Sequence, residues 1–386
     1  MNFEFFTATR IVFGPGCYKS LDHLITGIGK SALVVSGSSD RFIHDLLEVL
    51  RRKCIAAHRF QVSREPSVNT VREGVQFARE SECDFIIGLG GGSVIDAAKA
   101  ISVMLTNEGD ILDYIEVVGT GKKIKNPSLP CIAIPTTSGT GAEVTVNAVL
   151  EVPEHRIKAS LRSPFLATRI AVVDPELTLN LPPKITAYTG MDALTQLIEP
   201  YTSKLSNPLI NPLCREGIRR VSNALKRAYD SGDDLSARED MSFASLIGGL
   251  ALANAKLGAV HGFAGPIGGM YRAPHGAICA RLLPYVMEIN VRALMERGDK
   301  TILSRYEDIA KILTQNDRAC IQDGIAWIQE LNDTFEIPPL SACGVMESDF
   351  PFLIERAAKA SSMRGNPIEL TNEEMLEILT KATYSK

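Results

Sequence analysis

Two histidines and an aspartate in the second half of the chain could bind a metal ion together. Asp192 and Gln196 are four positions apart, which places them one turn apart on the same face of the helix expected there. His261 and His275 each precede a glycine, on either side of a turn expected at residues 265–269. A carboxylate, an amide and two imidazoles can share one divalent cation. The same residues also fit hydrogen-bonded core histidines and an aspartate that caps a helix.

A glycine-rich turn in the first half has the properties of a phosphate site. An apolar run at residues 85–89 leads into a glycine triplet that includes Gly91 and Gly92, and Ser93 is expected to open the following helix. Glycine lets the backbone approach a ligand closely, and the free amides of a helix start bind phosphate. The alternative is a sharp turn that needs glycine only for its backbone conformation.

A second loop, at residues 135–145, also follows an apolar run and is rich in hydroxyl groups. Its hydroxyl and amide donors suit the ribose and phosphates of a nucleotide, although a solvated turn has the same composition. Two such loops indicate a dinucleotide.

These residues need two kinds of scaffold. Short β-branched runs alternate with amphipathic stretches up to about residue 180, a pattern typical of a doubly wound parallel sheet. Beyond that point the pattern is helical. We therefore predict an α/β dinucleotide-binding domain at residues 1–180 and an all-helical metal and substrate domain at 181–386.

Composition excludes several classes of protein. Lys and Arg number 41 against 45 Asp and Glu, a net charge of −4 in 386 residues, so neither nucleic acid nor a membrane surface is an expected partner. The eight cysteines are spread singly, and the N-terminus has no secretory signal, so reduced thiols and a cytoplasmic location are expected. Polar residues interrupt the apolar stretch at 243–270, which favours buried helices over a membrane span.

Taken together, these segments resemble the iron-containing (group III) alcohol dehydrogenases. The likeness runs in family order over nearly the whole chain, and it is carried by Gly90-Gly91-Gly92-Ser93 with Asp96 and Lys99, Pro135 to Thr140, Asp174-Pro175, Gly190 to Thr195, His261-Gly262 and Pro274-His275-Gly276. The family implies a Rossmann-like domain followed by a helical domain, in the architecture also found in dehydroquinate synthase. It also implies a homodimer or higher homo-oligomer that interconverts small alcohols with aldehydes or ketones, using NAD or NADP and a divalent metal, Fe²⁺ or Zn²⁺.

The resemblance assigns roles to individual residues. The metal ligands would be Asp192, Gln196, His261 and His275. Lys158 matches a lysine near the cofactor, and the positions that match cofactor contacts are Gly91, Gly92, Ser93, Asp96, Thr136, Thr137, Thr140, Thr145 and Val149.

The chain departs from the family pattern at two of these positions. Gln196 stands where the family has a histidine, so we expect looser metal binding, a shift away from iron, or a site without metal. Gly265 stands where the family has the histidine credited with relaying the alcohol proton. Water, Tyr271 or a ribose hydroxyl would then carry that proton, and His261 would remain as the catalytic histidine.

Cofactor choice is expected to depend on the turn after the first long apolar strand. Family members that prefer NAD usually carry an aspartate where this chain has Gly37, and that carboxylate repels a 2′-phosphate. Gly37, Ser38 and Ser39 offer small donors instead, which favours NADP. Asp40 could still reach the ribose after a shift of the loop.

Two other functions compete with this interpretation. One is a lyase of the dehydroquinate-synthase type, which returns its nicotinamide unchanged. The other is a nucleotide-binding protein with a degenerate metal site, which the residues at 196 and 265 would explain.

Overall fold

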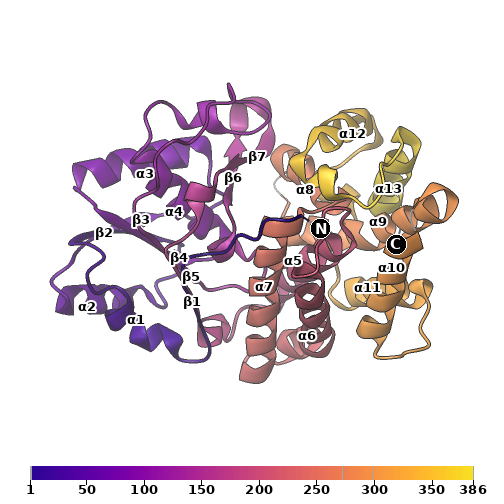
Figure 1. Cartoon of the computed structure of the whole chain (residues 1–386), viewed down its shortest axis with the longest axis horizontal. Coiled ribbons are helices and arrows are strands. Elements are labelled where there is room, and N and C mark those ends of the chain that lie inside the picture. Colours follow the sequence, from indigo (N-terminus) through magenta and orange to yellow (C-terminus); the bar gives the residue numbers. More distant parts are fainter. Residues whose placement is uncertain (1, 272, 299, 386) are drawn as a thin grey trace. The chain divides into compact units, whose positions relative to one another are not determined.

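A computed structural model describes residues 2–271, 273–298 and 300–385. The chain divides into two compact units, each with its own core (Figure 1). The α/β unit comprises Phe6–Thr137 and Gly141–Leu179. The helical unit comprises Asn180–Lys386, with Ser138–Thr140 and Met1–Phe5.

The α/β unit is built on a parallel six-stranded sheet, as the sequence predicts. The strand order is β1-β8-β5-β4-β2-β3, and β6 and β7 form a separate antiparallel hairpin that was not anticipated. The strands are β1 (Ile11–Phe13), β2 (Ser31–Ser36), β3 (Ala56–Gln61), β4 (Phe85–Gly90), β5 (Cys131–Pro135), β6 (Asn147–Val152), β7 (Ile157–Arg162) and β8 (Ile170–Val173).

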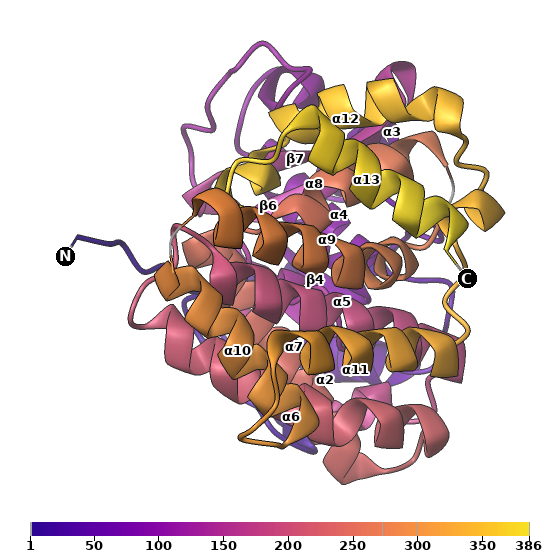
Figure 2. The same ribbon diagram turned by 90° about the vertical axis from the view of Figure 1, so that its right-hand side faces the viewer.

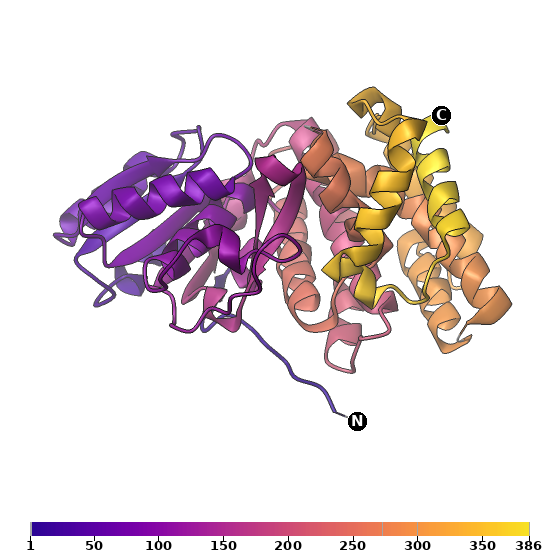
Figure 3. The ribbon, with the colours of Figure 1, turned by 90° about the horizontal axis from the view of Figure 1, so that it is seen from above.

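The side chains of alternate strand residues belong to two apolar cores, one on each face of the sheet. Leu33 and Val35 of β2 pack with α3 (Val68–Glu80) and α4 (Gly92–Met104), whereas Ala32 and Val34 pack with α1 (Leu21–Leu24) and α2 (Ile43–Arg52). The sheet therefore lies between two helical layers (Figure 3).

The order of the strands locates the ligand-binding edge of this sheet. From β2 the chain continues to β3 on one side, and from β4 it continues to β5 on the other. Neighbouring strands whose connections leave in opposite directions open a crevice at their carboxyl ends, where α/β proteins bind ligands. The turn at Ser36–Asp40 and the glycine turn both begin there.

The second unit is mostly helical, as the sequence predicts (Figure 2). The helix α5 packs extensively against α6, α7 and α9, with its buried residues in one large apolar core. The helices are α5 (Pro183–Thr202), α6 (Ile210–Asp230), α7 (Leu235–Ala255), α8 (Ala259–Met270), α9 (His275–Arg297), α10 (Lys300–Thr314), α11 (Ile321–Thr334), α12 (Phe350–Lys359) and α13 (Asn372–Tyr384).

Two local predictions were wrong. The glycines and proline at 265–269 do not form a turn but lie inside α8, where Phe263, Ala264 and Ile267 bury one side of the helix in the core. Tertiary packing outweighs the low helix propensity of glycine and proline. In addition, α4 begins at Gly92 with Gly91 as its N-cap, so Ser93 does not open that helix.

No described helix is by itself long and apolar enough to cross a membrane. Only α7 and α8 taken together pass that test of length and composition, and they are bent by 101° at their junction. Apolar residues of both belong to the core of the helical unit.

Candidate metal centre and cofactor loops

Three helices of the helical unit bring four potential metal donors together. Asp192 comes from the middle of α5, His261 from the first turn of α8, and His275 with Cys279 from the start of α9. One oxygen, nitrogen or sulfur atom from each side chain lies within 4.8 Å of the other three. We call these four residues the Asp192 cluster. Because Asp192 lies well inside α5, it does not cap that helix.

The potential donor atoms of the Asp192 cluster lie close to one another. Oδ1 of Asp192 is 3.4 Å from Nε2 of His261 and 3.7 Å from Nε2 of His275. Sγ of Cys279 is 3.9 Å and 3.6 Å from the same two nitrogens. The two rings lie 5.4 Å apart between centroids. The structure thus brings residues 192, 261 and 275 together, and their binding of a metal stays a prediction.

The carboxylate of Asp192 is buried, with two imidazole rings as its nearest partners. The residue is 3% exposed, and its Oδ1 makes no hydrogen bond to any described residue. Burial would raise the pKa of Asp192, but the rings of His275 and His261 outweigh burial and hold this pKa below its usual value. A buried carboxylate oxygen whose near neighbours are two imidazole nitrogens and a thiol, all metal donors, fits a bound cation.

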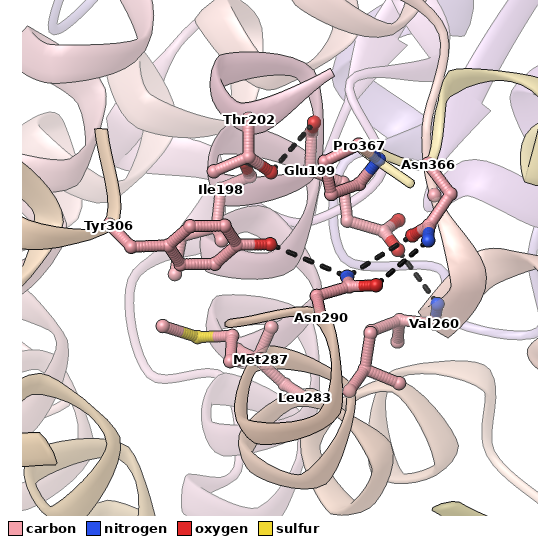
Figure 4. A pocket seen from close by; sticks show the side chains of 12 residues that line it. Ile198, Glu199, Thr202, Val260, Leu283, Met287, Asn290, Tyr306, Asn366 and Pro367 are labelled. Carbon is pink, nitrogen blue, oxygen red and sulfur yellow. Dashed lines mark hydrogen bonds between the residues drawn. The ribbon is translucent and has the colours of Figure 1, made fainter. Parts of the chain in front are cut away.

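Glu199, which sequence reasoning missed, fixes the orientation of His261. Its Oε2 lies 2.6 Å from Nδ1 of His261, and its Oε1 accepts from the backbone amide of Val260 at 2.7 Å. Figure 4 shows this carboxylate lining a small pocket beside Asn290 and Asn366. A proton held on Nδ1 leaves the lone pair of Nε2 free for a metal. The spacing of seven residues from Asp192 on one helix could have indicated Glu199.

The Pro-His-Gly sequence positions His275 through a close backbone contact. A Cβ atom at Gly276 would overlap the backbone of Tyr188, less than two turns before Asp192 on α5. Only glycine allows the start of α9 to approach α5 this closely. The contact places His275, the first residue of α9, beside Asp192.

Gln196 and Tyr271, which were also predicted at this site, have hydrogen-bond partners outside the Asp192 cluster. Gln196 is 2% exposed, and its Nε2 donates to the carbonyl of Gly139 at 3.0 Å. Gly265 lies one turn after His261 in α8. The hydroxyl of Tyr271 donates to Oδ2 of Asp349, a carboxylate outside the Asp192 cluster.

The glycine turn and the threonine loop lie side by side at the carboxyl edge of the sheet. Strands β4 and β5 are neighbours, and the amide of Thr136 donates to the carbonyl of Gly90 at 2.9 Å. A Cβ atom at Gly90 would come within 2.6 Å of Val94, so this glycine is needed for α4 to pack on β4. No described side chain caps α4 at Gly91, which leaves the helix start to a ligand.

Several of the predicted cofactor residues also have structural partners inside the α/β unit. Nζ of the fully buried Lys99 lies 3.2 Å from Oδ1 of Asp96 and donates to Oγ1 of Thr145 at 2.8 Å. Oδ2 of Asp96 accepts from the amide of Val149 at 2.9 Å. Nζ of Lys158, on β7, lies 3.5 Å from Glu65. Contact of these residues with a cofactor stays a prediction.

An arginine that sequence reasoning missed lies against the turn after β2. From β3, Nε of Arg59 donates to Oγ of Ser36 at 2.9 Å, and its other end pairs with Asp40 at 2.6 Å. A guanidinium therefore lies beside Gly37, Ser38 and Ser39. The parallel pairing of β3 with β2 creates this contact, and the sequence prediction did not include β3.

Comparisons with known proteins agree with this fold. The family "Iron-containing alcohol dehydrogenase" matches residues 8–175, and its C-terminal family, "Fe-containing alcohol dehydrogenase family, C-terminal", matches 186–383. The chain is 34% identical to 1,3-propanediol dehydrogenase of Klebsiella pneumoniae and 35% identical to NADPH-dependent butanol dehydrogenase of Clostridium saccharobutylicum, covering 98% of each chain in both cases. It superposes on the crystal structure of a 1,3-propanediol oxidoreductase with a TM-score of 0.91 and 33% identity, over 99% of this chain and 100% of that one.

Fold and site thus define an oxidoreductase with a dinucleotide-binding sheet and a helical metal-binding unit. The chain belongs to the iron-containing alcohol dehydrogenase family. It is an enzyme of the NAD(P)-dependent alcohol dehydrogenase type, and neither the lyase nor the non-catalytic alternative is favoured.

Proposed function

We propose that this enzyme reduces small aldehydes or ketones, and oxidises the corresponding alcohols, at a divalent metal held by Asp192, His261 and His275. The observation that carries the proposal is the buried Oδ1 of Asp192, which faces two imidazole nitrogens at 3.4 and 3.7 Å. One carboxylate and two imidazoles suit Zn²⁺ or Fe²⁺. When bound, such a cation supplies a Lewis acid for the substrate oxygen, and the nicotinamide supplies the hydride.

The chain's own residues prepare this site. Asp192 supplies negative charge, and its burial limits the water that would screen this charge. Glu199 holds the proton of His261 on Nδ1, so that Nε2 faces the cluster. For the proton of the alcohol, Tyr271 remains our candidate, and its hydrogen bond to Asp349 gives that proton a carboxylate acceptor.

We further propose that NADP is the preferred cofactor. Arg59 and the serines of the turn after β2 offer a guanidinium and hydroxyl donors for a 2′-phosphate, and Asp40 is already paired with Arg59. The name of the Clostridium saccharobutylicum relative, an NADPH-dependent enzyme, supports this choice.

Substitutions in this turn test the choice of cofactor. Gly37→Asp should shift the NADP/NAD ratio of kcat/KM toward NAD by roughly tenfold to a hundredfold, because it adds a carboxylate beside the guanidinium that would bind the phosphate. A Cβ atom at residue 37 has Val94 as its nearest neighbour, at 3.8 Å, so the new side chain fits. Arg59→Ala should move the ratio in the same direction. Arg41→Ala is the control and should leave the ratio unchanged. Arg41 is an exposed arginine directly after this turn, and its guanidinium donates to the carbonyl of Leu179. An unchanged ratio in both Gly37→Asp and Arg59→Ala would contradict NADP recognition here.

The activity itself is tested by NADPH oxidation with a panel of short aldehydes, using chelator-treated enzyme to which a metal is returned. We expect turnover to follow the bound metal with a stoichiometry of one per chain. Full turnover without metal would remove the Asp192 cluster from the reaction.

We also propose a cytoplasmic location and a homo-oligomeric state. The eight unpaired cysteines favour a reducing compartment.

A further inference from the structure

The donor atom that the structure brings to Asp192, His261 and His275 as a fourth member of the cluster is the sulfur of Cys279. We infer that the thiolate of Cys279 is a metal ligand and replaces the imidazole that the chain lacks at Gln196. This inference rests on the metal-dependent function proposed above and adds the identity of the ligand set. It also predicts which metals the enzyme selects.

The separations fit four protein donors, one of them sulfur, arranged as on a tetrahedron, with the substrate oxygen as a fifth ligand when it binds. With metal bonds of about 2.0–2.1 Å to nitrogen or oxygen and about 2.3 Å to sulfur, neighbouring donors of a tetrahedron lie about 3.3–3.6 Å apart. Four of the six separations in the cluster are 3.4, 3.6, 3.7 and 3.9 Å, and two of them are distances from Sγ of Cys279 to an imidazole nitrogen. Small rotations of the side chains would close the difference.

The position of Cys279 on α9 makes it a fixed donor. His275 and Cys279 are four residues apart, so their side chains share one face of the helix and reach the same point. Cys279 is fully buried, and the carboxylate that it approaches has an oxygen with no hydrogen bond to any described group. Nε2 of Gln196, on the neighbouring turn of α5, donates to the carbonyl of Gly139, which fixes this amide through its nitrogen.

A thiolate at this position would change the charge and softness of the site. Together with Asp192 it would supply two negative charges, which balance a divalent cation, while the two histidines bind as neutral donors. The thiol proton is released to solvent when the metal binds. Thiolate favours Zn²⁺ or Co²⁺ over the hard ions Mg²⁺ and Mn²⁺.

The test is cobalt spectroscopy on the full-length protein after removal of metal with a chelator. Titration with Co²⁺ alone should produce a near-ultraviolet thiolate-to-cobalt charge-transfer band that saturates at one equivalent. Cys279→Ser should lose this band. Cys214→Ser, at an equally buried cysteine of α6, and Gln196→Ala should both keep it. Bound Co²⁺ without the band in the wild-type protein would overturn the inference, and this holds even if Cys279→Ser fails to fold.

Zn²⁺ affinity, measured by competition with a chelating dye, gives a second readout. We expect Cys279→Ser to weaken Zn²⁺ binding by at least about a hundredfold, because a ligand should matter at least as much as the outer partners of ligands, which contribute about 10- to 100-fold. Gln196→Ala should weaken it less than about tenfold. The reverse order would overturn the inference in favour of Gln196.

The failures of this inference and of the proposed function can be told apart. Metal-dependent turnover without a thiolate band would keep the function and reject Cys279 as a ligand. A thiolate band without turnover on any aldehyde would keep the ligand and reject the function. Absence of Co²⁺ and Zn²⁺ binding would reject both.

Discussion

The two units each bury a cluster of ionisable side chains, but the clusters balance their charge in different ways. In the α/β unit, the ammonium group of Lys99 lies 3.2 Å from the carboxylate of Asp96 and donates to the carbonyl of Ala142 at 2.7 Å and to Thr145. In the helical unit, the Asp192 cluster contains a carboxylate, two imidazoles and a thiol, with no lysine or arginine in contact that the structure describes.

This difference separates a structural cluster from a functional one. Lys99 connects α4 to the loop at 142–145, so its charge is used to hold the α/β unit together. The Asp192 cluster instead consists only of groups that can bind a metal: a carboxylate, two imidazoles and a thiol. An ammonium group cannot bind a metal, so buried charge alone does not mark an active site, whereas a buried set of metal donors does.

The difference between the two clusters predicts that the largest effect of a substitution on metal binding and activity is at Asp192. Asp192→Asn should lower metal occupancy and reduce kcat/KM by about a thousandfold or more, because it removes several kcal/mol of electrostatic stabilisation at the metal. Metal content by mass spectrometry and NADPH oxidation are the measurements. Asp96→Asn, in the self-neutralised cluster, serves as the control and should retain full metal content. Equal loss of metal in both variants would erase the distinction between the clusters.

Lys99→Met should instead act on folding. The variant leaves the buried carboxylate of Asp96 without its cation, which is expected to lower the free energy of unfolding of the α/β unit by about 3–5 kcal/mol. Chemical denaturation followed by circular dichroism measures this change. Lys19→Met, which removes an exposed pair with Glu176, should cost less than about 1 kcal/mol. A loss of similar size in both variants would show that Lys99 does not balance a buried charge.

A pH dependence of stability should arise next to Lys99. Burial raises the pKa of Glu143 from 4.5 to about 7. Between these values the folded chain keeps the proton and the unfolded chain loses it, so the contribution of Glu143 to stability falls as pH rises from about 4.5 to 7. Glu143→Gln should therefore be more stable than the parent at pH 8, by at most about 3 kcal/mol, and should differ little at pH 4.5. Thermal unfolding at the two pH values measures this. A pH-independent difference would contradict the raised pKa.

A smaller effect on Zn²⁺ binding is expected at Glu199, which contacts the donor His261 but is not itself a donor. Glu199→Gln should keep the fold but weaken Zn²⁺ binding by about 10- to 100-fold, because it removes the charge that holds the proton on Nδ1 of His261. Glu374→Gln, at another largely buried acid of the helical unit, one that pairs with Arg297, is the matched control and should leave Zn²⁺ affinity unchanged. If the two variants behave alike, Glu199 does not tune the site.

Much of the architecture could be predicted from sequence because it follows from periodicity. The alternation of strands and helices up to about residue 180, and the helical pattern beyond it, are encoded by local patterns. The segment at 265–269 misled this approach, since glycine and proline predict a turn and only burial in the core keeps it helical.

The candidate site could be predicted only in part. Asp192, His261 and His275 stand out by residue type and by the glycines beside them. Cys279 and Arg59 do not stand out in the sequence, because their roles depend on contacts between helices or strands that are distant in the chain. A single cysteine one turn after a histidine has no distinctive spacing, and an arginine on an edge strand gains meaning only when β3 pairs with β2.

The central claim is that Asp192, His261 and His275 hold one divalent metal ion, and anomalous diffraction tests it most directly. Crystals of protein loaded with Zn²⁺, measured on both sides of the zinc absorption edge, should show one strong anomalous peak per chain in contact with these three side chains. A peak bound elsewhere, or loaded crystals with no peak among residues 192, 261 and 275, would contradict the account.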